Sequence, residues 1–379
     1  MLALEPPTVD EGVLQALCLS EDTLRKGSKS FTLAKLGWGR EIRCGLVAVY
    51  GCTMLTAPRN VCQDNLIDES TSRQESERML HMMKDFLRLV YTPVVQGEEN
   101  AVNDFICNRV PTAAIPSFYL FAKLLPDMIP RRAFDDLLQG YEMDLCFSSG
   151  HASDEALNGR RRDTRRSIIE RSPIKTRVEL TRYADHVAGS VATMICHLAW
   201  AICDREAGEV PVAEWQQIGE KARMMGCALQ FVNVARDIRT DALLRRLYIP
   251  LTEFENRQED LEKLFNNPDA LTTNDYARYT KGLLRTANRE RQEAAPYIEL
   301  LPRTARAGTR AMIASYFEIG KEIERRGGGV GAERLRISKW RRIAAVLKGF
   351  WGWGTPRAPF GHSSLKEKAQ LVLRFLLGA

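Results

Sequence analysis

Apolar residues recur at three- and four-residue intervals through most of the chain, as at Leu80, Met83, Leu87 and Val90. This spacing places them on one face of a helix, whereas the strict alternation typical of a half-buried strand is scarce. Proline and glycine interrupt the pattern where helices are expected to end. The main interruptions are Pro93, Pro111, Pro116, Pro126, Pro130, Pro173, Gly208, Pro211, Pro250, Pro268 and Pro302. The pattern predicts an all-α fold of roughly ten to twelve helices.

Composition divides the chain into three parts. Residues 1–19 are expected to form an N-terminal extension, residues 20–326 one helical domain, and residues 327–379 a basic, tryptophan-containing tail that begins at a run of glycines. Residues 150–172 are polar and basic with little apolar periodicity, so they predict a surface loop or flap. The most apolar stretch, residues 187–203, is shorter than the ~20 residues that a membrane span requires, and it predicts a buried helix.

The tail is open to two interpretations. Basic residues are interspersed with large apolar ones over Lys339, Trp340, Arg341, Arg342, Leu347, Lys348, Phe350, Trp351 and Trp353. Such a segment can lie on a membrane surface with its apolar side in the lipid. A helix packed on the core, with its lysines and arginines outward, would have the same composition.

The charge balance narrows the choice of partners. The 379 residues carry a formal charge of +6, and basic residues are interleaved with acidic ones. This balance does not favour nucleic-acid binding, whereas anionic small ligands or lipid headgroups suit it better. The nine cysteines lack CxxC pairs and companion histidines, so zinc is not expected. The first residues carry acids and proline in place of a secretory signal, so we expect reduced thiols and a cytoplasmic protein, either free or peripheral to an intracellular membrane.

One short acidic pattern occurs twice, as Asp64 with Asp68 and as Asp237 with Asp241. Residues four apart share a helix face, so each pair places two carboxylates side by side, a repulsion of roughly 0.2–0.5 kcal/mol on an isolated helix. A hard divalent cation removes this repulsion, because Mg²⁺ prefers oxygen ligands and is commonly shared between carboxylates and substrate phosphates. A single such pair is common on exposed helices, so the surroundings of the pair decide its meaning.

The second pair lies in an apolar segment. Apolar neighbours leave Gln230, Asn233, Asp237 and Asp241 along one helical stripe. Polar groups on an otherwise apolar helix are expected to face a cavity lined by protein. Arginines that can grip phosphate oxygens are close in sequence to both pairs, at Arg40, Arg43, Arg236, Arg245 and Arg246. The residues therefore predict that two acidic helix faces bridge a diphosphate through magnesium ions.

Six segments between residues 20 and 345 resemble, in the same order, the squalene/phytoene synthase family. They are Ser28-Lys29-Ser30-Phe31; Arg40-Glu41-Ile42-Arg43 leading to Ala48-Val49-Tyr50; Leu66-Ile67-Asp68-Glu69; Gly140-Tyr141-Glu142-Met143-Asp144; Tyr183-Ala184-Asp185-His186-Val187-Ala188-Gly189-Ser190-Val191; and Asn233-Val234-Ala235-Arg236-Asp237 through Tyr248-Ile249-Pro250. The last segment is similar to the fungal form of phytoene synthase more than to squalene synthase.

The resemblance implies an isoprenoid-synthase helical bundle around a central cavity. It implies head-to-head condensation of two geranylgeranyl diphosphates to phytoene with release of diphosphate, Mg²⁺ or alternatively Mn²⁺ as cofactor, no NADPH, and downstream carotenoid enzymes as partners. Positions that match the family's metal ligands are Asp64, Asp68, Asn233, Asp237 and Asp241. Positions that match diphosphate contacts or frame the cavity are Ser28, Ser30, Gln230, Arg236 and Arg246. Tyr183 matches an aromatic position near the reacting carbons.

The expected mechanism begins with ionisation. Metal and arginines stabilise the departing diphosphate and leave an allylic cation in a water-excluded cavity. The double bond of the second substrate attacks this cation and gives a cyclopropyl diphosphate, which ionises again and rearranges. The aromatic faces of Tyr50, Tyr183 and Tyr248 can stabilise cations, although packing alone would also explain each tyrosine.

The chain departs from the family before the first acidic pair. More residues than usual separate Tyr50 from Asp64, including Pro58, which should interrupt the helix there, and Val61 replaces a common arginine. A squalene-type synthase that uses NADPH, a one-substrate terpene cyclase and a catalytically impaired assembly factor are the alternatives. The last should have lost its acidic pairs, whereas both are intact here.

Overall fold

The computed structural model describes residues 15–20, 38, 42, 44–49, 73–93, 100–147, 169–203, 212–330, 335 and 337–352. Every regular element among these residues is helical, which confirms the all-α prediction. The labelled elements are α4 (Arg73–Val90), α5 (Ala101–Arg109), η3 (Thr112–Ala114), α6 (Ile115–Leu124), α7 (Arg131–Phe147), α10 (Arg177–Ala184), η4 (Asp185–Gly189), α11 (Ser190–Cys203), α12 (Val212–Leu243), η5 (Leu251–Phe254), α13 (Gln258–Asn266), η6 (Pro268–Ala270), α14 (Thr273–Ala294), η7 (Ala295–Leu300), α15 (Arg303–Arg325) and α16 (Lys339–Trp351).

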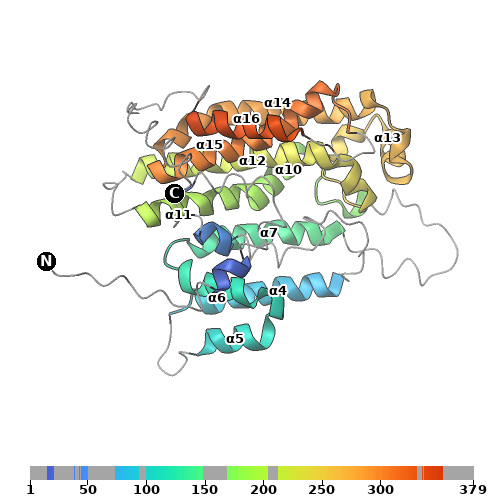
Figure 1. Cartoon of the computed structure of the whole chain (residues 1–379). Helices are drawn as coiled ribbons and strands as arrows, with labels where there is room; N and C mark the ends of the chain where they lie inside the picture. Colours follow the sequence, from blue (N-terminus) through green and yellow to red (C-terminus); the bar gives the residue numbers. More distant parts are fainter. Residues whose placement is uncertain are drawn as a thin grey trace, which may run out of the picture.

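The longest of these helices, α12, lies in the middle of the molecule. Helices α4 to α7 lie on one side of it and α14 to α16 on the other, with most axes running in a similar direction (Figure 1). α12 packs directly against α10, α11, α14, α15 and the π-helical turn η4. Because neighbours surround it, apolar residues are needed on most of its sides. Its buried residues include Ala228, Phe231, Val232, Ala235 and Ile238.

Aromatic side chains join α4, α6 and α7. The ring centroids of Phe86 and Phe118 are 4.7 Å apart, and those of Phe121 and Phe134 are also 4.7 Å apart. All four side chains are almost completely buried. Tilted aromatic pairs at this separation add to the free energy gained from burial, so this half of the fold has a well-packed core.

The apolar stretch at residues 187–203 forms the end of η4 and the whole of α11, and its Met194, Leu198 and Ala199 are fully buried. The prediction of a buried helix is therefore confirmed. Among the described residues no helix is both long and apolar enough to cross a membrane. The predicted flap lies outside the described residues up to residue 168.

Within the predicted tail, α16 packs on α15. Ala345, Val346 and Gly349 are buried in this contact, and a Cβ at Gly349 would lie 2.7 Å from the carbonyl oxygen of Arg310. The two helix backbones approach so closely that only glycine fits. One face of α16 is therefore packed on the core, as the second interpretation of the tail expects. That interpretation also placed the arginines outward, whereas Arg341 points inward to α15.

Candidate active site

α12 carries the predicted polar stripe. Gln230, Asn233, Asp237 and Asp241 are all partly exposed, whereas the apolar residues between them are buried, among them Phe231, Val234 and Ile238. The Nδ2 of Asn233 donates a hydrogen bond of 3.3 Å to Oε1 of Gln230. The Oδ1 of Asn233 is buried and has no hydrogen-bond partner among the described residues. Because buried carbonyl oxygens rarely remain unsatisfied, this oxygen is suited to a ligand.

The two carboxylates of the stripe influence each other. Burial raises the pKa of Asp241 well above its usual range, and the nearby Asp237 raises it further, whereas Arg246 and Arg236 lower it. Two acids in this arrangement are unfavourable without a cation. Oxygen ligands from Asn233, Asp237 and Asp241, spaced four residues apart, fit a hard divalent cation such as Mg²⁺.

No group of three or more His, Cys, Asp or Glu in the described part of the chain could hold a metal. The stripe provides two carboxylates and one amide oxygen, so it could form only one side of a metal cluster. Asp64 and Asp68, the predicted other side, lie outside the described residues. The meeting of the two acidic faces therefore stays a prediction.

Arg236 grips the carboxylate of its chain neighbour Asp237. Its Nε donates to Oδ1 at 2.7 Å, and its Nη2 forms a second, very short contact with Oδ2. Burial opposes the charged guanidinium, but the attraction of Asp237 outweighs it and the pKa of Arg236 lies above its ordinary value. Both side chains are 32% exposed, so this fork is accessible to a ligand.

A tight turn after α12 directs Arg246 back toward the helix. Arg245 adopts a left-handed conformation with φ of 58°, and the N–H of Arg246 donates to the carbonyl oxygen of Asp241 at 2.8 Å. This is a Schellman-type end in which arginine replaces the usual glycine, an uncommon choice for this backbone region. The Nη1 of Arg245 donates to the carbonyl oxygen of Phe265, which holds the turn in place. The side chain of Arg246 is buried as a result.

Next to Arg246, the buried carboxylate of Asp144 joins two tyrosines. The hydroxyl of Tyr248 donates to Oδ1 of Asp144 at 2.7 Å, and the hydroxyl of Tyr183 donates to Oδ2 at 3.4 Å. The two rings are stacked, with centroids 4.9 Å apart and planes inclined by 25°. The carboxylate of Asp144 on α7 therefore connects α10, which carries Tyr183, with the loop after α12, which carries Tyr248.

Burial dominates the electrostatics of this cluster. It raises the pKa of Asp144, while Arg246 and the two tyrosine hydroxyls favour the charged form. Burial together with Asp144 raises the pKa of Tyr183 and of Tyr248 well above their ordinary values. Both tyrosines are therefore neutral hydrogen-bond donors, and Asp144 fixes the orientation of their rings.

An ion triplet fixes the turn that follows Tyr183. Nη1 of Arg223, on α12, contacts Oδ2 of Asp136 on α7 at 2.9 Å, and its Nε donates to Oδ1 of Asp185 on η4 at 2.7 Å. The hydrogen bond to Asp185 is the main reason why the pKa of Arg223 lies above its ordinary value. π-Helical turns are frequent at functional sites, and here the ion pairs connect such a turn to α12 and, through Arg223, to α7.

The structure thus brings the predicted Tyr183, Arg246 and Tyr248 into one cluster, beside the α12 stripe that carries Gln230, Asn233, Arg236, Asp237 and Asp241. Ser28, Ser30, Arg40, Arg43, Tyr50, Asp64 and Asp68 lie outside the described residues. Asp144 was not predicted as a site residue. The sequence offered one indication of its role, because Asp144 occupies a position on the buried face of α7. An acidic residue is rarely buried there unless it has a partner.

Comparison with known proteins assigns the fold and the family. The model of the squalene/phytoene synthase family matches residues 24–341. The chain therefore belongs to the squalene/phytoene synthase family, and the resemblance stated from its motifs is confirmed.

Two fungal relatives are similar over most of this chain. It is 28% identical over 347 residues to a bifunctional lycopene cyclase/phytoene synthase of Phaeosphaeria nodorum, covering 92% of this chain and 53% of that protein. It is 29% identical over 386 residues to the protein of the same name from Phaffia rhodozyma, covering 87% and 54%. The chain spans about half the length of these relatives.

Solved structures share the fold. A dehydrosqualene synthase in complex with ligand aligns with a TM-score of 0.61 at 19% identity, covering 89% of this chain and 96% of the other. A squalene synthase of Alicyclobacillus acidocaldarius aligns with a TM-score of 0.56 at 15% identity, covering 84% and 97%. The isoprenoid-synthase helical fold is therefore confirmed.

Proposed function

We propose that this chain joins two molecules of geranylgeranyl diphosphate head to head, forming phytoene and releasing diphosphate. Membership of the squalene/phytoene synthase family and the similarity to proteins named for phytoene synthase support this choice. The observation that carries it is the α12 stripe, in which two mutually repelling carboxylates follow a buried, unpartnered amide oxygen. Such a stripe is costly for folding and is explained by a function that needs cationic ligands.

Asn233, Asp237 and Asp241 are the proposed ligands of Mg²⁺, which Mn²⁺ could replace. Asp64 and Asp68 are proposed to supply the opposite side of the cluster. When bound, the metal supplies positive charge that stabilises the departing diphosphate. In this proposal Asp237 is released from part of its pairing with Arg236, whose guanidinium then turns to a phosphate oxygen.

The remaining charged and polar residues are proposed to hold the diphosphates. Arg246 is buried beside the stripe, so its charge acts in surroundings of low polarity, where it is worth more than in water. Gln230 positions Asn233 through their hydrogen bond. Further contacts are proposed for Ser28, Ser30, Arg40 and Arg43, outside the described residues.

The stacked tyrosines are proposed to line the space in which the cations form. Because the hydroxyls of Tyr183 and Tyr248 are both tied to Asp144, the ring faces cannot rotate freely. An aromatic face attracts a cation through its quadrupole, and a buried, neutral tyrosine brings no loose water to a reactive carbocation. Tyr50 is a further candidate for this role, outside the described residues.

Product analysis tests the proposal. The purified chain is incubated with geranylgeranyl diphosphate and Mg²⁺, with and without NADPH, and the extracted lipid is identified. Phytoene should form in both cases, and chelation of the metal should stop its formation. A reduced product that requires NADPH would indicate a squalene-type enzyme, and a cyclic product from one substrate molecule would indicate a terpene cyclase; either would overturn the proposal.

The proposed location of the enzyme follows from the lipid solubility of its proposed product. Phytoene is a hydrocarbon that partitions into lipid, so the proposal includes a cytoplasmic enzyme in peripheral contact with an intracellular membrane. Downstream carotenoid enzymes are proposed to take the product from that membrane.

A further inference from the structure

Helix α16 has two faces of different character. Its inner face lies on α15 through Ala345, Val346 and Gly349. On the outer side, Trp340, Ile343, Leu347 and Trp351 follow one another at intervals of three or four residues and so form one stripe. We call these four residues the outer stripe of α16.

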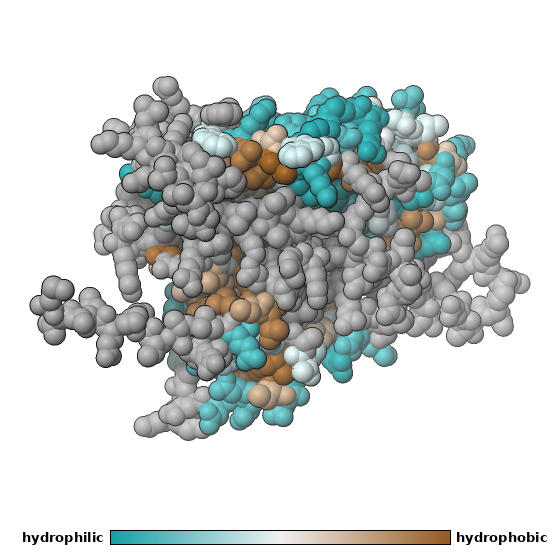
Figure 2. Space-filling view, viewed as in Figure 1, coloured by the Kyte–Doolittle hydropathy of each residue, from teal (hydrophilic) through white to brown (hydrophobic). Residues whose placement is uncertain are grey.

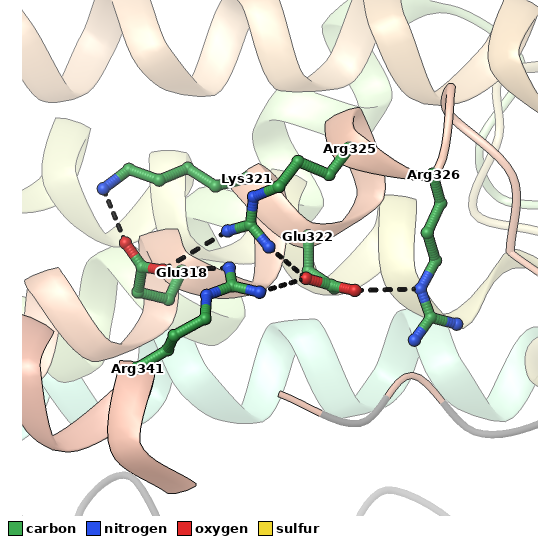
Figure 3. Close-up of polar contacts among 6 residues, drawn as sticks. All are labelled: Glu318, Lys321, Glu322, Arg325, Arg326 and Arg341. Atoms are coloured by element: carbon green, nitrogen blue, oxygen red, sulfur yellow. Dashed lines mark hydrogen bonds and ion pairs between the residues drawn. The ribbon is translucent and has the colours of Figure 1, made fainter. Parts of the chain in front are cut away.

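The first turns of α16 are held by a network of charges. Nη1 of Arg341 contacts Oε2 of Glu322 at 2.6 Å and its Nη2 contacts Oε2 of Glu318 at 3.3 Å (Figure 3). The two glutamates also bind side chains of α15 and of its end, namely Lys321, Arg325 and Arg326. The carboxylates of Glu318 and Glu322 are only 11% and 14% exposed, so these contacts are shielded from water more than a surface ion pair is.

The last turn is held as well. Arg310 of α15 donates from Nε to the carbonyl oxygen of Gly349 at 2.9 Å and from Nη2 to that of Phe350 at 3.2 Å. The last carbonyl groups of a helix lack the usual partners within the helix, and Arg310 adds to the one bond that Gly349 accepts there, from the N–H of Gly352. Because both ends are fixed, α16 cannot turn its outer stripe toward the core.

The N-terminal half of the outer stripe is exposed. Trp340 is 80% exposed and Ile343 is 40% exposed, while Leu347 and Trp351 are partly exposed. Hydrophobic and pale atoms lie over α16 near the upper edge of the molecule, with hydrophilic residues above and beside them (Figure 2). The other large apolar residues exposed in the described part of the chain, Leu19, Val178 and Leu243, do not belong to such a stripe. Single exposed apolar residues are ordinary, whereas a fixed stripe with tryptophan indicates a partner.

The charge around the stripe identifies the chemistry of that partner. α16 contains Lys339, Arg341, Arg342 and Lys348 and no acidic residue. Lys339 and Lys348 are exposed near its two ends. Tryptophan favours the boundary between lipid and water, and lysines at such a helix reach the anionic headgroups. In a two-fold contact with a second copy, the lysines of two such helices would come together and repel each other.

We infer that α16 docks the protein on an anionic membrane, with Trp340 and Ile343 of the outer stripe inserted between headgroups and Lys339 and Lys348 binding their phosphates. This inference rests on the proposed peripheral membrane contact and names the surface that makes it. α16 lies flat in the interface, because its inner face remains bound to α15. The two interpretations of the tail are then compatible, since they describe opposite faces of one helix.

Vesicle flotation tests this surface. The full chain is mixed with phosphatidylcholine vesicles or with vesicles that also contain phosphatidylserine. Binding should require the anionic lipid and weaken at high salt. Removal of two inserting side chains in Trp340→Ala/Ile343→Ala should weaken binding about tenfold or more. Val178→Ala, which shortens an exposed apolar residue on α10 that is 68% exposed, is the matched control and should bind as the parent does.

Three results would overturn the inference. The first is a parent chain that does not float with anionic vesicles, and the second is a double variant that binds as well as the parent. The third is a double variant that melts at a much lower temperature, because this would show that protein covers the stripe. A change from dimer to monomer in the double variant, without vesicle binding by the parent, would assign the stripe to a second copy. The variant Asp237→Asn separates membrane binding from the proposed reaction. It should bind vesicles as the parent does, whether or not the proposed condensation is correct.

Discussion

At the scale of single residues, Asp144 connects several side chains of the candidate site. Asp144 is 1% exposed, and its carboxylate accepts hydrogen bonds from Tyr183 and Tyr248 and attracts Arg246. A buried acid is tolerated only when its partners compensate for lost hydration. The same partners are the residues proposed to line the reaction cavity, so this one group connects stability with function.

Asp144→Asn should impair both stability and turnover. The amide keeps the shape but removes the charge that compensates the buried Arg246, a loss of about 1–3 kcal/mol in the free energy of unfolding. Phytoene formation should fall at least about tenfold, because the two ring faces lose their common anchor. Denaturant unfolding and initial rates measure the two effects. Asp269→Asn is the control, since Asp269 pairs with Arg239 but is 60% exposed, and its loss should change stability little. Equal behaviour of the two variants would contradict this account of Asp144.

Glu290 on α14 is expected to make the stability of the protein depend on pH. Burial, with a further contribution from Glu293, raises the pKa of Glu290 to about 7, although Arg289 opposes the rise. Its Oε2 is buried and has no hydrogen-bond partner among the described residues. Between its unfolded pKa of 4.5 and about 7 the folded state binds more protons, so the free energy of unfolding falls as pH rises.

Glu290→Gln should remove this pH dependence. Relative to the parent, the variant should gain stability on the order of 1–2 kcal/mol between pH 5 and pH 8, a value reduced for partial exposure of the side chain. Urea unfolding at the two pH values measures the change. Parallel losses of stability in both proteins would show that Glu290 does not titrate in this range.

At the scale of elements, α12 serves as both the core of the fold and the support of the site. Arg223 ties its first half to η4 and α7, the polar stripe occupies its second half, and the turn at Arg245 ends it. Gly226 allows η4 to approach, since a Cβ there would lie 2.4 Å from the carbonyl oxygen of Ala188. The close packing of η4 on α12 therefore requires a glycine at position 226, in addition to the ion triplet of Arg223.

Two glycines of α12 should respond oppositely to alanine. Gly226→Ala should lower the free energy of unfolding by roughly 1–3 kcal/mol, because a methyl group meets rigid backbone. Gly219→Ala should raise it by about 0.5–1 kcal/mol, since nothing lies within 4 Å of the added Cβ and alanine favours the helix. Gly226→Ala should also slow turnover through displacement of η4. Changes of the same sign in both variants would contradict the proposed contact.

At the scale of the whole molecule, local patterns predicted some features and not others. The stripe on α12 was visible in the sequence because its polar residues interrupt an apolar helix at the helical period. The contacts of Asp144 were not visible, because its partners lie 39 and 104 residues away and no local pattern encodes that meeting. The contacts of η4 were equally hidden, since Arg223, Asp136 and Asp185 are far apart in the sequence. Which face of α16 is buried and which is exposed could be decided only from its packing on α15.

The central claim is that the stripe of α12 binds divalent metal together with the substrate diphosphate. Anomalous diffraction from crystals grown with Mn²⁺ and an unreactive thiolo analogue of geranylgeranyl diphosphate tests it most directly. The account predicts manganese peaks about 2.1 Å from oxygens of Asn233, Asp237 and Asp241, with the diphosphate between these residues and Asp64 and Asp68. A diphosphate bound without metal at α12, or manganese bound only elsewhere, would contradict it.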